Sequence, residues 1–290
     1  MSSGNAGSRT TAFVFRASTY PCSAVRSANA IRQNGERRYL IYLRYGLPIA
    51  SSSVVGNDAT DASRDRLVIF DADGTLIDAF PVVEQSFARH GMDIGDLGRF
   101  QRRRKLLKYI GGLREFPRKL RQQFDKETRK PLKRTLTNVY RAAAQPFPGM
   151  MELLQRLMEA PDVRIGIVSR NITIEPEDTL FIVLCRHGVD CERLDFLRCI
   201  PLGDGKAVQF RAVREAFCIN PLRAYVCGDE YRDCAEAIAA GMHAFIVSYG
   251  FEEHARLVDS FNIPPELIAN TPAELAGRLC HGLDLDSPAV

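Results

Sequence analysis

The fold is decided by the stretch Leu67-Val68-Ile69-Phe70-Asp71-Ala72-Asp73. Four consecutive apolar residues that end in an acid are typical of a fully buried parallel strand. Ligands of open parallel sheets bind beyond the carboxyl ends of the strands. We therefore expect Asp71 and Asp73 to lie at a functional edge of the sheet.

Outward from this stretch, apolar runs alternate with helical patterns of about ten residues, which indicates a parallel sheet with crossover helices. We expect strands at residues 163–168, 196–200, 224–227 and 243–247, and helices at 150–159, 179–187, 206–217 and 234–240. A mostly helical stretch separates the first strand from the second. The sequence thus predicts an α/β, Rossmann-like doubly wound parallel sheet over residues 65–78 and 147–275, with a helical cap inserted at 79–146.

Polar side chains follow several of the expected strands, and a lysine begins an expected helix. They are Asp71 and Asp73, Ser169, Asp229 with Asp233, and Lys206. This set suits phosphoryl transfer, because a carboxylate that attacks an anionic phosphate ester needs a cation and hydrogen-bond donors. Mg²⁺ prefers oxygen ligands.

Each of these side chains has a chemical part that it can perform. Asp71 and Asp229 can supply carboxylate oxygens to Mg²⁺, and a carboxylate can also act as the nucleophile. An acid two residues later can protonate the leaving oxygen and then activate water. Ser169 and Lys206 can hold phosphoryl oxygens, and Asp233 can orient Lys206 or a metal-bound water.

Four segments closely resemble, in order, the signatures of the haloacid dehalogenase superfamily. They are residues 68–78, residues 165–171, Lys206, and residues 226–233. The resemblance covers about residues 66–255. Residues 146–150, Pro-Phe-Pro-Gly-Met, are similar to the return from a helical cap in the phosphoglycolate-phosphatase-like subgroup.

The resemblance implies a role for each matching residue. An acid at the position of Asp73 favours a phosphatase, because the dehalogenases of the superfamily typically lack one there. The P-type ATPases typically have a Lys-Thr pair where this chain has Ala72-Asp73. The implied roles are nucleophile and magnesium ligand for Asp71, general acid/base and carbonyl ligand for Asp73, second metal carboxylate for Asp229, phosphate binding for Ser169, Arg170 and Lys206, and support of the metal site for Asp233.

These features predict an Mg²⁺-dependent phosphatase that hydrolyses a small phosphate monoester through an aspartyl-phosphate. Two alternatives stay open. A phosphosugar mutase of the same superfamily uses the same two aspartates but transfers phosphate between hydroxyls. A regulatory protein that kept the fold would show no magnesium-dependent hydrolysis.

Two segments differ in composition from the rest. Residues 1–64 are rich in Ser, Ala and Arg and contain no lysine. We interpret them as a disordered extension, an untranslated upstream region, or a transit peptide. Residues 99–134 hold 15 Lys/Arg against 3 Asp/Glu. We interpret these cations of the cap as a solvated helix face or as a positive surface that steers anionic substrates. Nucleic-acid binding is disfavoured because the sequence shows no aromatic stacking platform. These cations include Arg102, Arg103, Arg104, Lys105, Arg114, Arg118, Lys119 and Arg121.

The overall composition is that of a globular protein, with 46% hydrophobic and 26% charged residues. The longest apolar stretch is interrupted by Arg44 and serines, so we expect no membrane span. The eight cysteines contain no C-x-x-C pair, which favours free thiols and a reducing compartment. We expect a cytoplasmic monomer or homodimer, or an organellar protein if residues 1–64 are a transit peptide.

Overall fold

The computed structural model describes residues 28–33, 36–42, 48–49, 64–91 and 126–285. The chain divides into two units, Met1–Ser51 and Ser52–Val290. In the first, β1 (Ala28–Gln33), β2 (Glu36–Tyr42) and β3 (Pro48–Ile49) form an antiparallel sheet in that order. None of these strands has the sustained apolar–polar alternation that would have predicted it from the sequence. The interpretation of residues 1–64 stays a prediction.

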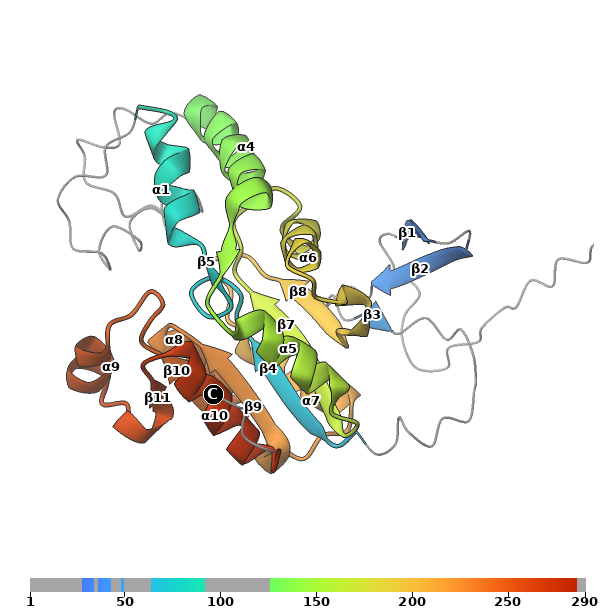
Figure 1. Cartoon of the computed structure of the whole chain (residues 1–290), viewed down its shortest axis with the longest axis vertical. Coiled ribbons are helices and arrows are strands. Elements are labelled where there is room, and N and C mark those ends of the chain that lie inside the picture. Colours follow the sequence, from blue (N-terminus) through green and yellow to red (C-terminus); the bar gives the residue numbers. More distant parts are fainter. Residues whose placement is uncertain (1–27, 34–35, 43–47, 50–63, 92–125, 286–290) are drawn as a thin grey trace, which may run out of the picture. The chain divides into compact units, whose positions relative to one another are not determined.

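The second unit is built on a six-stranded sheet in which all neighbouring strands are parallel. The strand order β11-β10-β9-β4-β7-β8 is that of a doubly wound Rossmann-like sheet, as the sequence predicted. The order reverses between β4 and β9, which lie side by side in the sheet (Figure 1). Ligands of doubly wound sheets bind beyond the carboxyl ends of the strands at such a point. The strands are β4 (Arg66–Phe70), β7 (Val163–Ser169), β8 (Phe196–Cys199), β9 (Ala224–Gly228), β10 (His243–Val247) and β11 (Ile268–Ala269).

Helices cover both faces of this sheet. Val68 and Phe70 of β4 belong to one core cluster with buried residues of α5, α6 and α10, whereas Leu67 and Ile69 are equally buried but lie outside that cluster. Alternate side chains of a strand point to opposite faces, so Leu67 and Ile69 face the side covered by α7 and α8. The helices are α5 (Met150–Glu159), α6 (Pro176–Arg186), α7 (Ala207–Ala216), α8 (Tyr231–Ala239), α9 (His254–Phe261) and α10 (Pro272–Gly282), with 3₁₀ turns at Cys191–Arg193, Pro221–Arg223 and Pro265–Leu267.

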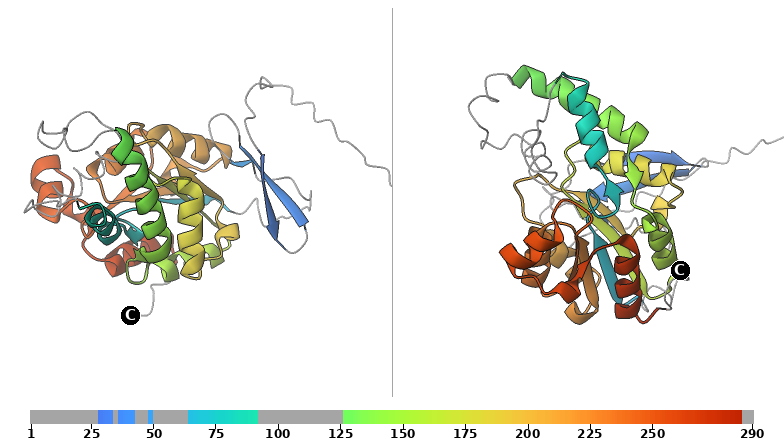
Figure 2. Two further views of the ribbon diagram at one scale, coloured as in Figure 1. Left: turned by 90° about the horizontal axis from the view of Figure 1, so that it is seen from above. Right: turned by 60° about the vertical axis from the view of Figure 1, so that its left-hand side comes forward.

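An inserted segment leaves the sheet after β4 and returns before α5. Its two ends pair as the antiparallel strands β5 (Ile77–Asp78) and β6 (Gln145–Pro146). Within it, α1 (Phe80–Ala88) and α4 (Lys126–Ala143) contact each other (Figures 1 and 2). The basic residues singled out in the cap, from Arg102 to Arg121, lie outside the described residues.

The core continues beyond residue 275, where the sequence analysis ended it. α10 crosses that boundary, and its residues Leu279 and Cys280, together with Leu283, are fully buried. All seven cysteines of the described ranges are free thiols. Among the described helices, none combines the length and the apolar character needed to cross a bilayer.

Candidate functional site

The loop after β4 fixes the position of Asp71. The Asp71 N–H donates to the carbonyl of Cys227 on the neighbouring strand β9 (2.8 Å), which continues the sheet ladder to this residue. The N–H groups of Thr75, Leu76 and Ile77 all point at the carbonyl of Ala72, at 2.9–3.3 Å. The chain therefore coils tightly behind the acid, and the Ala72 N–H donates to Asp71 Oδ1 (2.7 Å).

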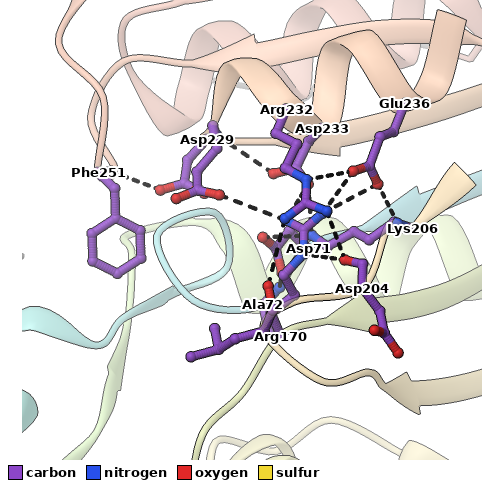
Figure 3. A network of polar contacts seen from close by, with 12 residues as sticks. Asp71, Ala72, Arg170, Asp204, Lys206, Asp229, Arg232, Asp233, Glu236 and Phe251 are labelled. Carbon is purple, nitrogen blue, oxygen red and sulfur yellow. Dashed lines mark hydrogen bonds and ion pairs between the residues drawn. The ribbon is translucent and has the colours of Figure 1, made fainter. Parts of the chain in front are cut away.

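Lys206 reaches the same point from the start of α7 (Figure 3). Its ammonium lies 2.7 Å from Asp71 Oδ2 and 2.8 Å from Asp233 Oδ1, and its side chain is only 1% exposed. Burial by itself lowers the pKa of Lys206, but Asp233 and Asp71 outweigh that effect and raise the pKa above its usual value. Lys206 is therefore a permanent cation beside Asp71.

Asp71, Asp229 and Asp233 form a buried acidic cluster. Each offers a carboxylate oxygen within 4.8 Å of the others. Burial raises the pKa of Asp71 and of Asp229, and repulsion among the acids adds to this rise. Oδ1 of Asp229 is buried without a hydrogen-bond partner among the described residues, and buried polar atoms are rarely left so.

These residues fit a divalent metal ion. Carboxylate oxygens are the ligands that hard cations prefer, and a cation would stabilise the charged forms that burial disfavours. All three acids offer a carboxylate oxygen to such an ion. Asp71 and Asp233 both pair with Lys206, and Asp233 also closes a capping box with Glu230 at the start of α8. Oδ1 of Asp229 is the carboxylate oxygen of the three that has no partner among the described residues.

Gly74 and Gly250 lie in close contact with Asp229. A Cβ at Gly74 would lie closer than 3.0 Å to the Asp229 carboxylate and to the Phe251 ring, and Gly74 has φ +90°. A Cβ at Gly250 would come equally close to Asp229 and to the carbonyl of Gly74. Asp229 Oδ2 accepts the N–H of Phe251 at 2.7 Å. The backbone therefore fills the space around this carboxylate and fixes its orientation.

Asp73 is held differently from the other acids. Its Oδ1 accepts the hydroxyl of Tyr140, and its Oδ2 accepts the amide of Asn171 at 3.0 Å. Burial raises the pKa of Asp73 to about 7, against the lowering effect of these two donors. A carboxyl group with such a pKa can both release and accept a proton near neutral pH.

Ser169 and Arg170 follow one another at the end of β7 but face different partners. The Ser169 hydroxyl is buried and near Asp71, whose pKa it lowers, yet it has no partner of ordinary hydrogen-bond geometry among the described residues. The Arg170 guanidinium pairs with both oxygens of Glu236 at 3.1 Å and lies 3.4 Å from Asp233. Ser169 is thus free to receive a ligand. Arg170, which the resemblance predicted to bind phosphate, instead pairs with acids of α8 and ties the loop after β7 to that helix.

The structure adds residues that the sequence did not single out. Glu236 joins Arg170 to the backbone N–H of Lys206. It lies one helical turn after Asp233, so helical spacing could have indicated it. Asn171 stood within the second signature without an assigned role. Tyr140 follows the apolar pattern of α4 and reads as an ordinary core residue.

The model of the haloacid dehalogenase-like hydrolases matches residues 66–241, more than half of the chain. The chain belongs to this family. The match covers every residue of the acidic cluster together with Asp73, Ser169 and Lys206.

This haloacid dehalogenase-like hydrolase is also similar to individual proteins. A phosphoglycolate phosphatase from Synechococcus elongatus is 26% identical over 220 residues, which cover 72% of this chain and 95% of that protein. A family hydrolase from Deinococcus radiodurans R1, with bound phosphate and sodium, has 18% identity and a TM-score of 0.52 over 78% of this chain and 100% of its own. A putative β-phosphoglucomutase from Thermotoga maritima has 18% identity and a TM-score of 0.53 over 74% and 99%. The two structures share the fold.

Proposed function

We propose that this hydrolase is an Mg²⁺-dependent phosphatase that cleaves a small phosphate monoester through an aspartyl-phosphate on Asp71. One observation carries the proposal: Asp71, Asp229 and Lys206 lie close together at the carboxyl ends of the strands. Asp73 follows two residues after Asp71, the proposed nucleophile. Family membership and the relative named phosphoglycolate phosphatase support the same reaction class.

In the first step, an oxygen of Asp71 attacks phosphorus. The bond between phosphorus and the ester oxygen breaks, and the proton of Asp73 moves to that oxygen, so that a neutral alcohol leaves. Lys206 and the hydroxyl of Ser169 hold the phosphoryl oxygens. Asp71 and Asp229 would hold Mg²⁺, with the Asp73 carbonyl as a third ligand, and the ion would neutralise the charge of the phosphoryl group.

In the second step, Asp73 is a carboxylate and accepts a proton from a water molecule as that water attacks phosphorus. The bond between phosphorus and Asp71 breaks, which returns free Asp71 and releases inorganic phosphate. Asp73 regains its proton in this step, so the cycle closes. Asp233 and Glu236 keep Lys206 in place throughout, and Arg170 ties both acids to the loop that carries Ser169.

A phosphate-release screen over metabolite esters, with and without Mg²⁺, tests the proposal. The relative's name makes 2-phosphoglycolate the first substrate to assay, followed by sugar phosphates and nucleotides. We expect Mg²⁺-dependent release that Asp71→Asn abolishes. Turnover that survives in Asp71→Asn would assign the nucleophile elsewhere, and transfer of phosphate between sugar hydroxyls without release would favour a mutase.

A further inference from the structure

Tyr140 connects the inserted segment to the proposed general acid. It lies near the end of α4, its side chain is 2% exposed, and its hydroxyl donates to Asp73 Oδ1. Asn171, from the loop after β7, donates to Oδ2 of the same carboxyl group at 3.0 Å. Two donors from segments far apart in the chain therefore hold Asp73, one on each oxygen.

The direction of both hydrogen bonds is fixed by the surroundings. Asn171 Oδ1 accepts from the N–H and from the hydroxyl of Thr173 (3.0 and 2.5 Å), so the Asn171 amide nitrogen must face Asp73. A carboxylate oxygen can only accept a hydrogen bond, so the Tyr140 hydroxyl is the donor to Asp73 Oδ1. Together the two donors restrict rotation of the Asp73 carboxyl group. Each carboxyl oxygen keeps a further lone pair that can carry the transferred proton.

The end of α4 is fastened to the core and not only to the rest of the insertion. The Ile174 N–H donates to the Thr137 hydroxyl at 2.8 Å, and Arg141 donates to the Thr179 hydroxyl at 3.0 Å. Arg186 of α6 donates to the carbonyl of Arg141. These bonds flank Tyr140 on both sides along the helix. These bonds therefore fix the position of Tyr140 relative to the loop after β7 and to α6.

We infer that Tyr140 is a positioning residue for the reaction: it aims the carboxyl group of Asp73 at the ester oxygen that leaves. The inference rests on the proposed role of Asp73 as general acid. It predicts that loss of the Tyr140 hydroxyl harms only the substrates whose leaving group needs a proton.

The experiment compares two esters in the full chain with saturating Mg²⁺. Propyl phosphate releases an alkoxide unless it is protonated, whereas p-nitrophenyl phosphate releases a stable anion. For Tyr140→Phe we expect kcat/KM to fall about 10- to 100-fold with propyl phosphate, a part of the ~10²–10⁴-fold that general acid–base catalysis contributes. With p-nitrophenyl phosphate we expect a fall of less than about threefold, because kcat/KM reports only the steps up to departure of the leaving group.

Three further variants keep the test decisive. Leu136 lies in the core one turn earlier on α4, and Leu136→Ala should lower kcat/KM by the same factor with both esters. Thr137→Val does not touch Asp73 and should lower kcat/KM selectively with propyl phosphate, by a smaller factor than Tyr140→Phe. Equal losses with the two esters in Tyr140→Phe, at an unchanged Tm, would overturn the positioning role. If Tyr140→Phe does not fold, an equal loss in Thr137→Val overturns it instead. If Asp73→Asn lowers kcat/KM by the same factor with both esters, Asp73 is not the general acid, and the proposed function is refuted.

Discussion

Substitution of Gly74 tests whether the backbone around Asp229 controls the proposed metal site. Ala at this position must adopt φ +90° and place its Cβ against the Asp229 carboxylate. The left-handed conformation costs about 1–2 kcal/mol, and overpacking adds about 1–3 kcal/mol. We therefore expect Gly74→Ala to lose about 2–5 kcal/mol of unfolding free energy, and to need at least about tenfold more Mg²⁺ for half-maximal activity, equivalent to ~1.4 kcal/mol.

Two other glycines separate the two contributions. Gly149 has φ +79° with open space around it, so Gly149→Ala should lose only the conformational part, about 1–2 kcal/mol, with unchanged Mg²⁺ dependence. Gly250 has no such conformation but is equally crowded, so Gly250→Ala should share the shift in Mg²⁺ dependence. Chemical denaturation measures stability, and phosphate release titrated with Mg²⁺ measures the site. The reasoning fails if Gly74→Ala matches Gly149→Ala in both assays.

Two further predictions concern charge. Lys206→Met removes the cation that contacts Asp71 and should lower kcat by about 10²–10³-fold, as loss of one preorganised donor does; activity within tenfold of wild type would contradict this role. In the metal-free protein the pKa of Asp73 is raised from 3.8 to about 7, so its stabilising contribution is present at low pH and is lost as pH rises from about 4 to about 7. The Tm of chelator-treated wild type should therefore fall more over this range than that of Asp73→Asn, and parallel curves for the two proteins would refute the shift.

The sequence predicts the sheet, and the edge of it that carries the candidate site, because both depend on local patterns. The apolar run before Asp71 and the one before Gly228 predict buried strands, and polar residues that end parallel strands meet at one edge. Asp233 was expected to orient either Lys206 or a metal-bound water, and the structure places its Oδ1 2.8 Å from the Lys206 ammonium.

Other features depend on tertiary contacts that leave no local signal. Tyr140 reads as one more apolar position of an amphipathic helix, and only packing of α4 on the core brings it to Asp73. β5 and β6 have two residues each, too few for a period of two to emerge. Arg170 follows directly after Ser169, yet its partners on α8 could be found only from the fold.

The central position of β9 has a consequence for biosynthesis. Asp71 and Asp229 end adjacent strands although 158 positions separate them in the chain. A nascent chain that has emerged only through β8 contains Asp71, but the edge of β4 that β9 will cover is still open, and exposed strand edges favour aggregation. Pairing of β9 covers that edge and brings Asp229 beside Asp71. Until the chain through β9 has been made, this edge of β4 stays uncovered and Asp229 is absent from the site.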